Sequence, residues 1–256
     1  MTLLTVKDLT KIFGGLIAVN DVSFDVAKDS VVGLIGPNGA GKTTVFNCIT
    51  GNYRPEQGVI EFKGADITGM APNRIVKMGV ARTFQSIRLF PRMSALENVL
   101  AGRHCRLKSG FLACMLHTPA QRREEKAAIE RCMDELEFVG LSHLYADMGG
   151  ALAYGQQRLL EIARALASDP ELLILDEPAG GMNDQETAGL VELISRIRER
   201  GVTILLIEHD MRLVMKVCQK LIALEHGALI AQGDAETVRN NPDVITAYLG
   251  VDDEKW

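Results

Sequence analysis

The residue pattern most able to do chemistry is a glycine-rich segment, GPNGAGKTT, at positions 36 to 44. It matches GxxxxGK[ST] and stands between an apolar run that predicts a strand and a helix-like segment, VFNCIT. The alternative, a glycine-rich turn that binds no ligand, would need neither the strand before it nor the helix after it. Backbone N–H groups of such a loop converge on phosphate oxygens at the start of a helix, where the lysine also reaches the β- and γ-phosphates and the hydroxyl after it ligates Mg²⁺. The expected phosphate-binding residues are Gly36, Pro37, Asn38, Gly39, Ala40, Gly41, Lys42, Thr43 and Thr44, with Thr43 also a metal ligand.

A second pattern, LLILDEP at positions 172 to 178, ends an apolar run with two carboxylates. Unpaired charges at the end of a buried strand are costly, so an acidic pair there indicates a cation or a proton to handle. We expect Asp176 to hold Mg²⁺ through water and Glu177 to polarise a water for in-line attack on the γ-phosphate. The alternative is that both acids only cap the helix that follows.

Continuous apolar runs predict the strands that position these residues. Such runs are typical of parallel strands covered on both faces, and each is followed by a candidate helix, which predicts an α/β core. The runs are 30–36, 172–176 and 203–207. By contrast, 20–26 alternates apolar and polar residues, as an antiparallel strand with one wet face does. Near the C-terminus, 221–233 predicts a hairpin around Gly227, followed by short helices capped by Asp234 and Asn241.

The stretch from about 93 to 165 differs from the core. Strand-like runs vanish there, and 121–139 carries apolar residues at helical spacing among many charges. We therefore expect a single domain over 1–256, with a helical subdomain inserted at about 93–165 into the α/β core.

Composition excludes several classes of protein. The chain has 256 residues, 47% of them hydrophobic and 24% charged, and a formal net charge of −5, which argues against a nucleic-acid partner. Charges near the N-terminus do not fit a signal peptide, and no stretch reaches the roughly 18 apolar residues of a membrane span. Any membrane role is therefore expected to come through a partner.

Together with further motifs, these patterns resemble those of the ATP-binding cassette (ABC) ATPases, and the motifs fall in that family's order. The resemblance implies a P-loop cassette with a parallel core sheet, an N-terminal antiparallel β subdomain and the inserted helices. In KIFGG it implies that Phe13 stacks on adenine, although a core phenylalanine is the competing interpretation. In ARTFQ it makes Gln85 a ligand of Mg²⁺ and the attacking water. In LLIEHD it makes His209 the histidine that touches the γ-phosphate, where a lone histidine would otherwise be read as a surface residue.

The segment LAYGQQ, 152–157, lies where the family has its LSGGQ signature. That signature binds the γ-phosphate of the ATP held by the opposite subunit. Here Ala153 replaces the serine and Tyr154 replaces a glycine, so the expected contact falls to the N–H of Gly155, to Gln156 and to the start of the following helix. One charge-assisted hydrogen bond, worth about 1.5–3 kcal/mol, is missing or supplied differently.

Over nearly the whole chain the sequence is similar to the larger ATP-binding subunit of bacterial branched-chain amino-acid importers. The stretches GPNGAGKTTVFNCITG, LAYGQQRLLEIARAL and NPDVITAYLG carry the likeness, as does a long segment before the signature, 104–125. The apolar run of that segment, 111–116, either touches lipid or a partner or packs within the helices. The resemblance implies ATP and Mg²⁺ as ligands, two permease subunits, a second identical or related ATPase, an indirect solute-binding protein, and a peripheral place on the cytoplasmic face of the inner membrane.

Other functions remain as alternatives. The chain lacks the [NT]KxD segment of a GTPase, and Gln85 and Leu152 are only 67 positions apart, too close for the coiled coil of a chromosome-maintenance ATPase. A single phosphate loop disfavours a two-cassette translation factor, and the intact acidic pair disfavours a nonenzymatic binding module. Import or export of another solute, such as urea, other amino acids or lipopolysaccharide, stays open.

Overall fold

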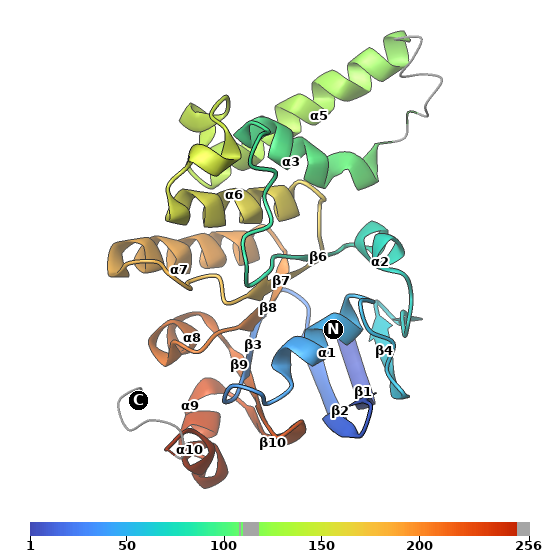
Figure 1. Ribbon diagram of the computed structural model, residues 1–256, viewed down its shortest axis with the longest axis vertical. Helices are drawn as coiled ribbons and strands as arrows, with labels where there is room; N and C mark the ends of the chain where they lie inside the picture. Colours follow the sequence, from blue (N-terminus) through green and yellow to red (C-terminus); the bar gives the residue numbers. More distant parts are fainter. Residues whose placement is uncertain (108, 110–117, 250–256) are drawn as a thin grey trace. The chain divides into compact units, whose positions relative to one another are not determined.

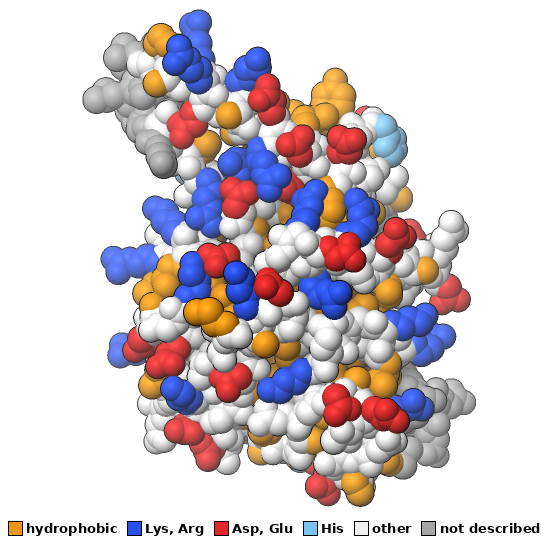
Figure 2. Space-filling model, turned by 180° about the vertical axis from the view of Figure 1, so that it is seen from behind, with side chains coloured by type: hydrophobic (Ala, Val, Ile, Leu, Met, Phe, Trp, Pro, Cys, Tyr) orange, Lys and Arg blue, Asp and Glu red, His pale blue; other side chains and the backbone are white. Residues whose placement is uncertain are grey.

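The computed structural model describes residues 1–107, 109 and 118–249. The described chain forms two compact units. The strand-rich unit comprises Met1–Arg82 with Glu171–Trp256, and the helical unit comprises Thr83–Pro170. The run 111–116 lies outside the described residues. Among those described, no helix is long and apolar enough to cross a membrane, and acidic and basic side chains are interspersed on the face seen in Figure 2.

The main sheet of the strand-rich unit has six strands in the order β10-β9-β3-β8-β7-β6 (Figure 1). Five of them run parallel, and β10 pairs antiparallel with β9 at one edge. The strands are β3 (Val31–Ile35), β6 (Val80–Arg82), β7 (Leu172–Asp176), β8 (Thr203–Ile207), β9 (Lys220–Glu225) and β10 (Ala228–Gly233). Every residue of β3, β7 and β8 is buried, because both faces of the sheet are covered. The predicted parallel strands and the C-terminal hairpin are confirmed.

A second, antiparallel sheet forms the N-terminal part of this unit. Its order is β2-β1-β4-β5, with β1 (Thr2–Phe13), β2 (Leu16–Ala27), β4 (Gln57–Phe62) and β5 (Ala65–Asp66). Within the predicted 20–26 segment, Val22, Phe24 and Val26 are buried. Asp21 and Asp25, between them, are exposed. The expected one-sided strand is therefore confirmed, although β2 begins earlier, at Leu16, because it pairs with β1 up to the turn at Gly14.

The described residues of the strand-rich unit also form six helices: α1 (Lys42–Ile49), α2 (Pro72–Met78), α7 (Asp184–Glu199), α8 (Met211–Val217), α9 (Ala235–Arg239) and α10 (Pro242–Leu249). Helix α1 inserts Phe46 and Ile49, both fully buried, into a core that both sheets share. The two predicted C-terminal caps are present. Asp234 Oδ1 accepts the N–H of Thr237 at 2.9 Å, and Asn241 Oδ1 accepts that of Asp243 at 2.8 Å.

The helical unit is built from α3 (Ala95–Arg103), α5 (Pro119–Phe138) and α6 (Tyr154–Leu166), which pack on one another (Figure 1). Short 3₁₀ turns lie at His104–Arg106, Ser142–Leu144 and Gly149–Ala151. The predicted inward face of α5 is confirmed, since Ala128, Cys132 and Leu136 are buried. With two sheets and this helical part, the α/β fold class inferred from the sequence is confirmed.

Candidate active site

The phosphate loop connects the end of β3 to the start of α1. Gly39 and Gly41 have φ values of 84° and 96°, a region that favours glycine. A Cβ on Gly36 would lie 2.2 Å from the carbonyl oxygen of Leu224, and one on Gly41 would lie 2.5 Å from that of Ala18. Backbone conformation and close packing therefore both require glycine at Gly36 and Gly41, whereas at Gly39 only the backbone conformation favours it.

Helix α1 starts without a side-chain cap. Gly41 occupies the N-cap position, and no acidic residue lies in the first turn. The first N–H groups of a helix have no partner within it, and they carry the positive end of the helix dipole. The uncapped helix start beside a glycine turn therefore fits a phosphate group.

Lys42 reaches back over this loop. Its Nζ donates to the carbonyl oxygens of Gly36 at 2.6 Å and Pro37 at 2.9 Å. Burial lowers the pKa of Lys42, and the charges of Glu177 and Asp176 oppose that shift. The structure thus brings the lysine and the acidic pair, which are far apart in sequence, into electrostatic contact.

Asp176 is the last residue of β7, and only 3% of it is exposed. Its Oδ2 lies 2.7 Å from Nη2 of Arg82, the last residue of β6. Arg82 Nη1 also donates to Asn47 Oδ1 in α1, at 2.7 Å. Arg82 therefore links the metal-ligand candidate to the helix of the phosphate loop. Arg82 was not predicted from the sequence, where nothing sets it apart from the other basic residues.

Glu177 follows β7 in a left-handed conformation, with φ of 48°. Its N–H donates to the carbonyl of Ile207, at the end of β8, at 2.9 Å. A left-handed glutamate costs energy and persists only where surrounding contacts hold it. The backbone of the proposed water-activating residue is thus fixed by the neighbouring strand.

Glu208, which was not predicted from the sequence, joins the segment after β7 to the segment after β8. Its exposure is 1%, and its carboxylate accepts the N–H of Ala179 at 2.8 Å and the N–H of His209 at 3.0 Å. Burial raises the pKa of Glu208, and these two hydrogen bonds oppose the shift. The His209 side chain itself is 59% exposed, so its ring is accessible to a ligand. The only sequence signal for Glu208 was an acid at the end of an apolar strand, next to the histidine.

Phe13 ends β1 on the surface. It is 40% exposed, so the interpretation as a core phenylalanine is wrong. Its ring meets Tyr53 edge-on, with centroids 5.1 Å apart, and Lys11 Nζ lies 5.0 Å from its centroid. Glu56 holds Lys11 by an ion pair of 2.7 Å. An exposed ring braced by its neighbours is suited to stacking on a base.

The signature segment belongs to the helical unit. Helix α6 begins at Tyr154 rather than Gln156, because Ala153 takes the N-cap position and Gln156 Oε1 accepts its N–H at 3.0 Å. Gly155 and Gln156 therefore lie in the first helical turn. Ala153 offers no side-chain oxygen, and Tyr154 is 46% exposed. This helix start keeps backbone donors of the kind that bind anions.

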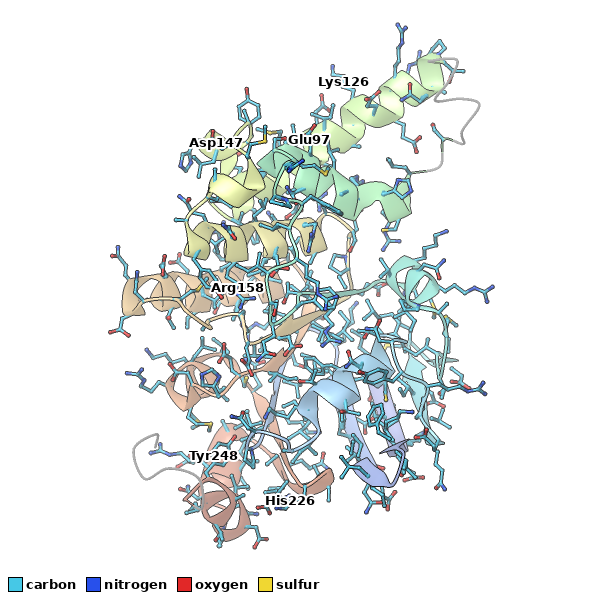
Figure 3. All side chains as sticks on the ribbon, viewed as in Figure 1. Glu97, Lys126, Asp147, Arg158, His226 and Tyr248 are labelled. Atoms are coloured by element: carbon cyan, nitrogen blue, oxygen red, sulfur yellow. The ribbon has the colours of Figure 1, made fainter. Side chains whose placement is uncertain are left out.

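Arg158, which is labelled in Figure 3, lies in α6 and connects this helix to the backbone of Gln85 within the helical unit. Its guanidinium donates to the carbonyl oxygens of Phe84, at 2.8 Å, and Gln85, and to the Tyr154 hydroxyl at 3.1 Å. It also lies 3.6 Å from the buried carboxylate of Glu161. The structure thus brings the Gln85 backbone and the start of the signature helix together.

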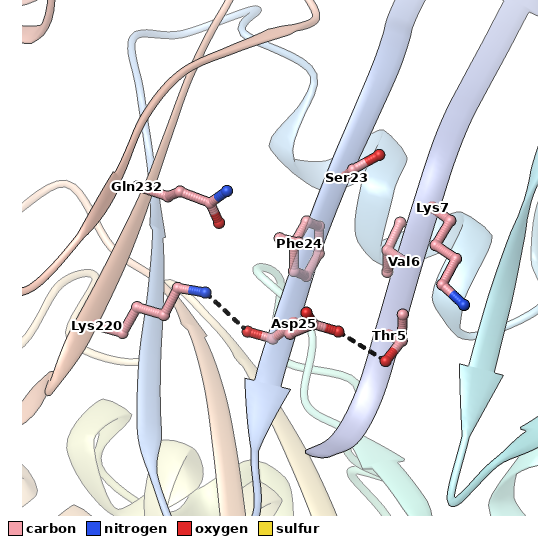
Figure 4. A pocket seen from close by; sticks show the side chains of 8 residues that line it. All are labelled: Thr5, Val6, Lys7, Ser23, Phe24, Asp25, Lys220 and Gln232. Carbon is pink, nitrogen blue, oxygen red and sulfur yellow. Dashed lines mark hydrogen bonds between the residues drawn. The ribbon is translucent and has the colours of Figure 1, made fainter.

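A shallow hollow of about 550 Å³ elsewhere in the strand-rich unit contains none of the predicted site residues (Figure 4). Several of its polar groups already have partners. Lys220 donates to the carbonyl oxygen of Asp25 at 3.2 Å, Thr5 donates to the Asp25 carboxylate at 2.7 Å, and Lys7 pairs with Glu61. None of these contacts indicates a reactive site.

Comparisons with known proteins agree with this geometry. The model of the ABC transporter family matches residues 19–180, and that of the branched-chain amino acid ATP-binding cassette transporters matches 228–254. The high-affinity branched-chain amino acid transport ATP-binding protein BraF of Pseudomonas aeruginosa is 51% identical over 97% of this chain and 98% of its own. LivG of Escherichia coli, with the same description, is 48% identical over the same shares.

A solved structure gives the same result. The crystal structure of an ATP-binding cassette of an ABC transporter, in its ADP conformation, is 34% identical, covers 98% of this chain and 99% of its own, and superposes with a TM-score of 0.86. The fold thus matches that of a solved cassette, and with the family model and the relatives above it shows that the chain belongs to the ABC transporter family.

Proposed function

We propose that this protein is the ATP-binding subunit of an importer that hydrolyses ATP to drive uptake of branched-chain amino acids. The observation that carries the proposal is the convergence of Lys42, Asp176 and Glu177 at one glycine-rich loop. Its relatives at 48–51% identity over nearly their whole length are described as branched-chain amino acid transport ATP-binding proteins.

The loop and its lysine bind the nucleotide phosphates. Backbone N–H groups of residues 38–43 surround the β-phosphate, and Lys42 exchanges the carbonyl oxygens of Gly36 and Pro37 for phosphate oxygens. Phe13 offers its exposed ring to the adenine. This part of the site recognises any adenine nucleotide that carries a β-phosphate.

Hydrolysis falls to Glu177 and His209. Glu177 accepts a hydrogen bond from the attacking water and directs it at the γ-phosphate, since its backbone is locked by Ile207. His209 contacts the γ-phosphate through its exposed ring, and Glu208 fixes its backbone. Both groups act by position, as is general in phosphoryl transfer.

The oxygen donors available here fit Mg²⁺. Within the strand-rich unit, the hydroxyl of Thr43 and the carboxylate of Asp176 are hard ligands of the type this ion prefers. The family resemblance adds the amide oxygen of Gln85 as a further proposed ligand. Bound Mg²⁺ would neutralise the charge of the β- and γ-phosphates. Arg82 already balances the charge of Asp176 and keeps that carboxylate oriented.

The signature segment completes the site of a second ATPase subunit, identical or related to this one. Gly155 and the first turn of α6 bind the γ-phosphate there, so each ATP is held between two chains. Closing and opening of the pair drive two permease subunits, which a solute-binding protein supplies, and the chain sits peripherally at the cytoplasmic face of the inner membrane. The surface around 86–90, where Phe90 is 50% exposed, receives the permease.

Reconstitution tests the proposal. The chain, combined with its permeases and second ATPase in vesicles, is expected to take up labelled leucine when MgATP and the binding protein are supplied. Lys42→Ala should abolish uptake while assembly persists. ATP-driven transport of a lipopolysaccharide or urea instead, with no leucine uptake, would contradict the assigned solute.

A further inference from the structure

The first residue of the phosphate loop is tied to the C-terminal helix. The N–H of Gly36 donates to the hydroxyl oxygen of Tyr248, 212 positions later, at 2.7 Å. Gly36 is buried, so this N–H has no access to bulk solvent as a substitute acceptor. The carbonyl of the same residue accepts Lys42 Nζ. Gly36 therefore joins the nucleotide-binding lysine to α10.

Tyr248 reaches this place because of how α10 is built (Figure 3). Val244, Ala247 and Tyr248 share one face of the helix, and the first two are buried at 0% and 5% exposure. The Asn241 cap fixes the start of the helix, and α10 packs against β10 and α9. The hydroxyl is thus held by a packed helix rather than by a loose terminus.

A second hydrogen bond from the C-terminal part holds the other end of the loop. At the turn between β9 and β10, the N–H of Gly227 donates to the carbonyl of Ala40 at 3.2 Å. The carbonyl of Gly227 in turn accepts the N–H of Asn20, at 2.8 Å. The segment 226–248 therefore holds the phosphate loop at both Gly36 and Ala40.

The Tyr248 hydroxyl keeps its proton at neutral pH. Burial raises the pKa of this phenol to about 12, and the hydrogen bond from Gly36 only partly offsets the shift. The contact is thus a neutral hydrogen bond that does not switch over the physiological pH range. A phenylalanine would keep the ring and remove the hydroxyl, and with it the acceptor of the Gly36 N–H.

We propose that Tyr248 is a positioning residue for nucleotide binding, through which α10 keeps the phosphate loop in its binding conformation. When the loop is always in its binding conformation, the apparent affinity for nucleotide is not reduced by a fraction of protein that occupies other conformations. Without the hydroxyl, the loop samples conformers in which its N–H groups no longer converge, so ATP and ADP bind more weakly. This inference rests on the proposed function, because it assumes that the loop binds a nucleotide phosphate.

The test compares Tyr248→Phe with Tyr145→Phe, a matched control at a tyrosine that is 48% exposed in the helical unit. Dissociation constants for MgATP and MgADP are measured by calorimetry on the full chain, and turnover at saturating ATP is measured in the assembled transporter. In Tyr248→Phe we expect both dissociation constants to rise by about three- to tenfold, with saturated turnover within about twofold of wild type. The control should change neither.

Hydrogen exchange supplies a second readout that does not depend on nucleotide. Backbone amides in the peptide covering 31–45 should exchange faster in Tyr248→Phe than in wild type, and at the wild-type rate in the control. Unchanged or tighter nucleotide binding in folded Tyr248→Phe would overturn the inference. This holds even if the melting temperature of the variant falls, because lower stability with unchanged binding would mean that the hydrogen bond is purely structural. Wild-type protein that binds neither nucleotide would instead refute the proposed function.

Discussion

The strand-rich unit and the helical unit hold their functional segments by different means. In the strand-rich unit, the ends of parallel strands place the phosphate loop, Asp176 and Glu177 along one edge, and backbone N–H groups supply many of the connections. In the helical unit, a buried guanidinium, Arg158, and a buried carboxylate, Glu161, hold the Gln85 segment to α6.

This contrast shows what each arrangement depends on. Backbone hydrogen bonds between strands follow from the fold and tolerate many side chains, whereas a buried charge pair depends on two particular residues. Removing one partner of such a pair leaves the other charge uncompensated. We therefore expect single substitutions at the strand edge to affect the chemistry, and those at the Arg158 cluster to affect the structure.

The largest effect is expected from Glu177→Gln. It preserves the shape and the backbone hydrogen bond to Ile207 but removes the base, so turnover should fall by about 10²-fold or more. ATP binding should persist, and the ATP-bound dimer should accumulate. Single-turnover hydrolysis and gel filtration with ATP measure both. Near wild-type turnover would mean that the strand edge does not position the catalytic base.

Arg158→Met probes the helical unit. It removes the donor to the carbonyl oxygens of Phe84 and Gln85 and one of the two arginines beside the Glu161 carboxylate, which keeps Arg164 at 3.4 Å. The free energy of unfolding should therefore fall by about 2–4 kcal/mol. Lys126→Met is the control, since that lysine on α5 has a 79% exposed side chain and should change stability by less than about 0.5 kcal/mol. Urea denaturation measures both variants. Equally small changes in the free energy of unfolding of both variants would contradict the contrast between the two units.

Glu208→Gln tests a second buried charge of the strand-rich unit, in addition to the Arg82–Asp176 ion pair. An amide presents one oxygen where the carboxylate presents two, so either Ala179 or His209 loses its acceptor. We expect turnover to fall about tenfold while nucleotide affinity holds, because a small displacement of catalytic groups is costly. Glu192→Gln on α7 is the exposed control. A loss of affinity without a loss of turnover would place Glu208 in binding instead.

Ala153→Ser should have the smallest effect. Serine at the N-cap of α6 adds an acceptor for the first turn and should stabilise the helical unit by about 0.5–1 kcal/mol. ATPase activity should change by less than about threefold if, as proposed, backbone donors of the first turn bind the phosphate. Ala151→Ser, just outside the helix, controls for the added hydroxyl. A tenfold gain in turnover at position 153 alone would show that the missing hydroxyl limits catalysis.

The strand-rich unit was largely predictable because its signals are local. Runs 172–176 and 203–207 give β7 and β8 with the same bounds, since fully buried parallel strands are continuous apolar runs. Strand β1 was not predicted, because bulges interrupt its alternation and Asp8 has a φ of 50°. The phosphate loop was predictable because backbone constraints within nine consecutive residues determine the spacing of its glycines.

Contacts between distant residues were not predictable. The site is supported by Arg82 on β6, Glu208 just after β8 and Tyr248 on α10, and these residue types alone fit ordinary surface or core positions. The exposure of Phe13 likewise depends on where β1 ends. The roles of Phe13, Gln85, His209 and the signature residues remain predictions that rest on the family resemblance.

The claim that each site is shared between two chains has a direct test, which uses two inactive variants. Glu177→Gln disables the strand-rich half of a site, and Gly155→Asp places a carboxylate against the γ-phosphate and disables the signature half. In a mixed pair, one site carries both defects and the other carries neither. Random pairing makes half of all pairs mixed, so an equal mixture should regain about a quarter of wild-type ATP turnover. If cross-linking shows that mixed pairs form and the mixture stays as inactive as its components, the shared site is contradicted.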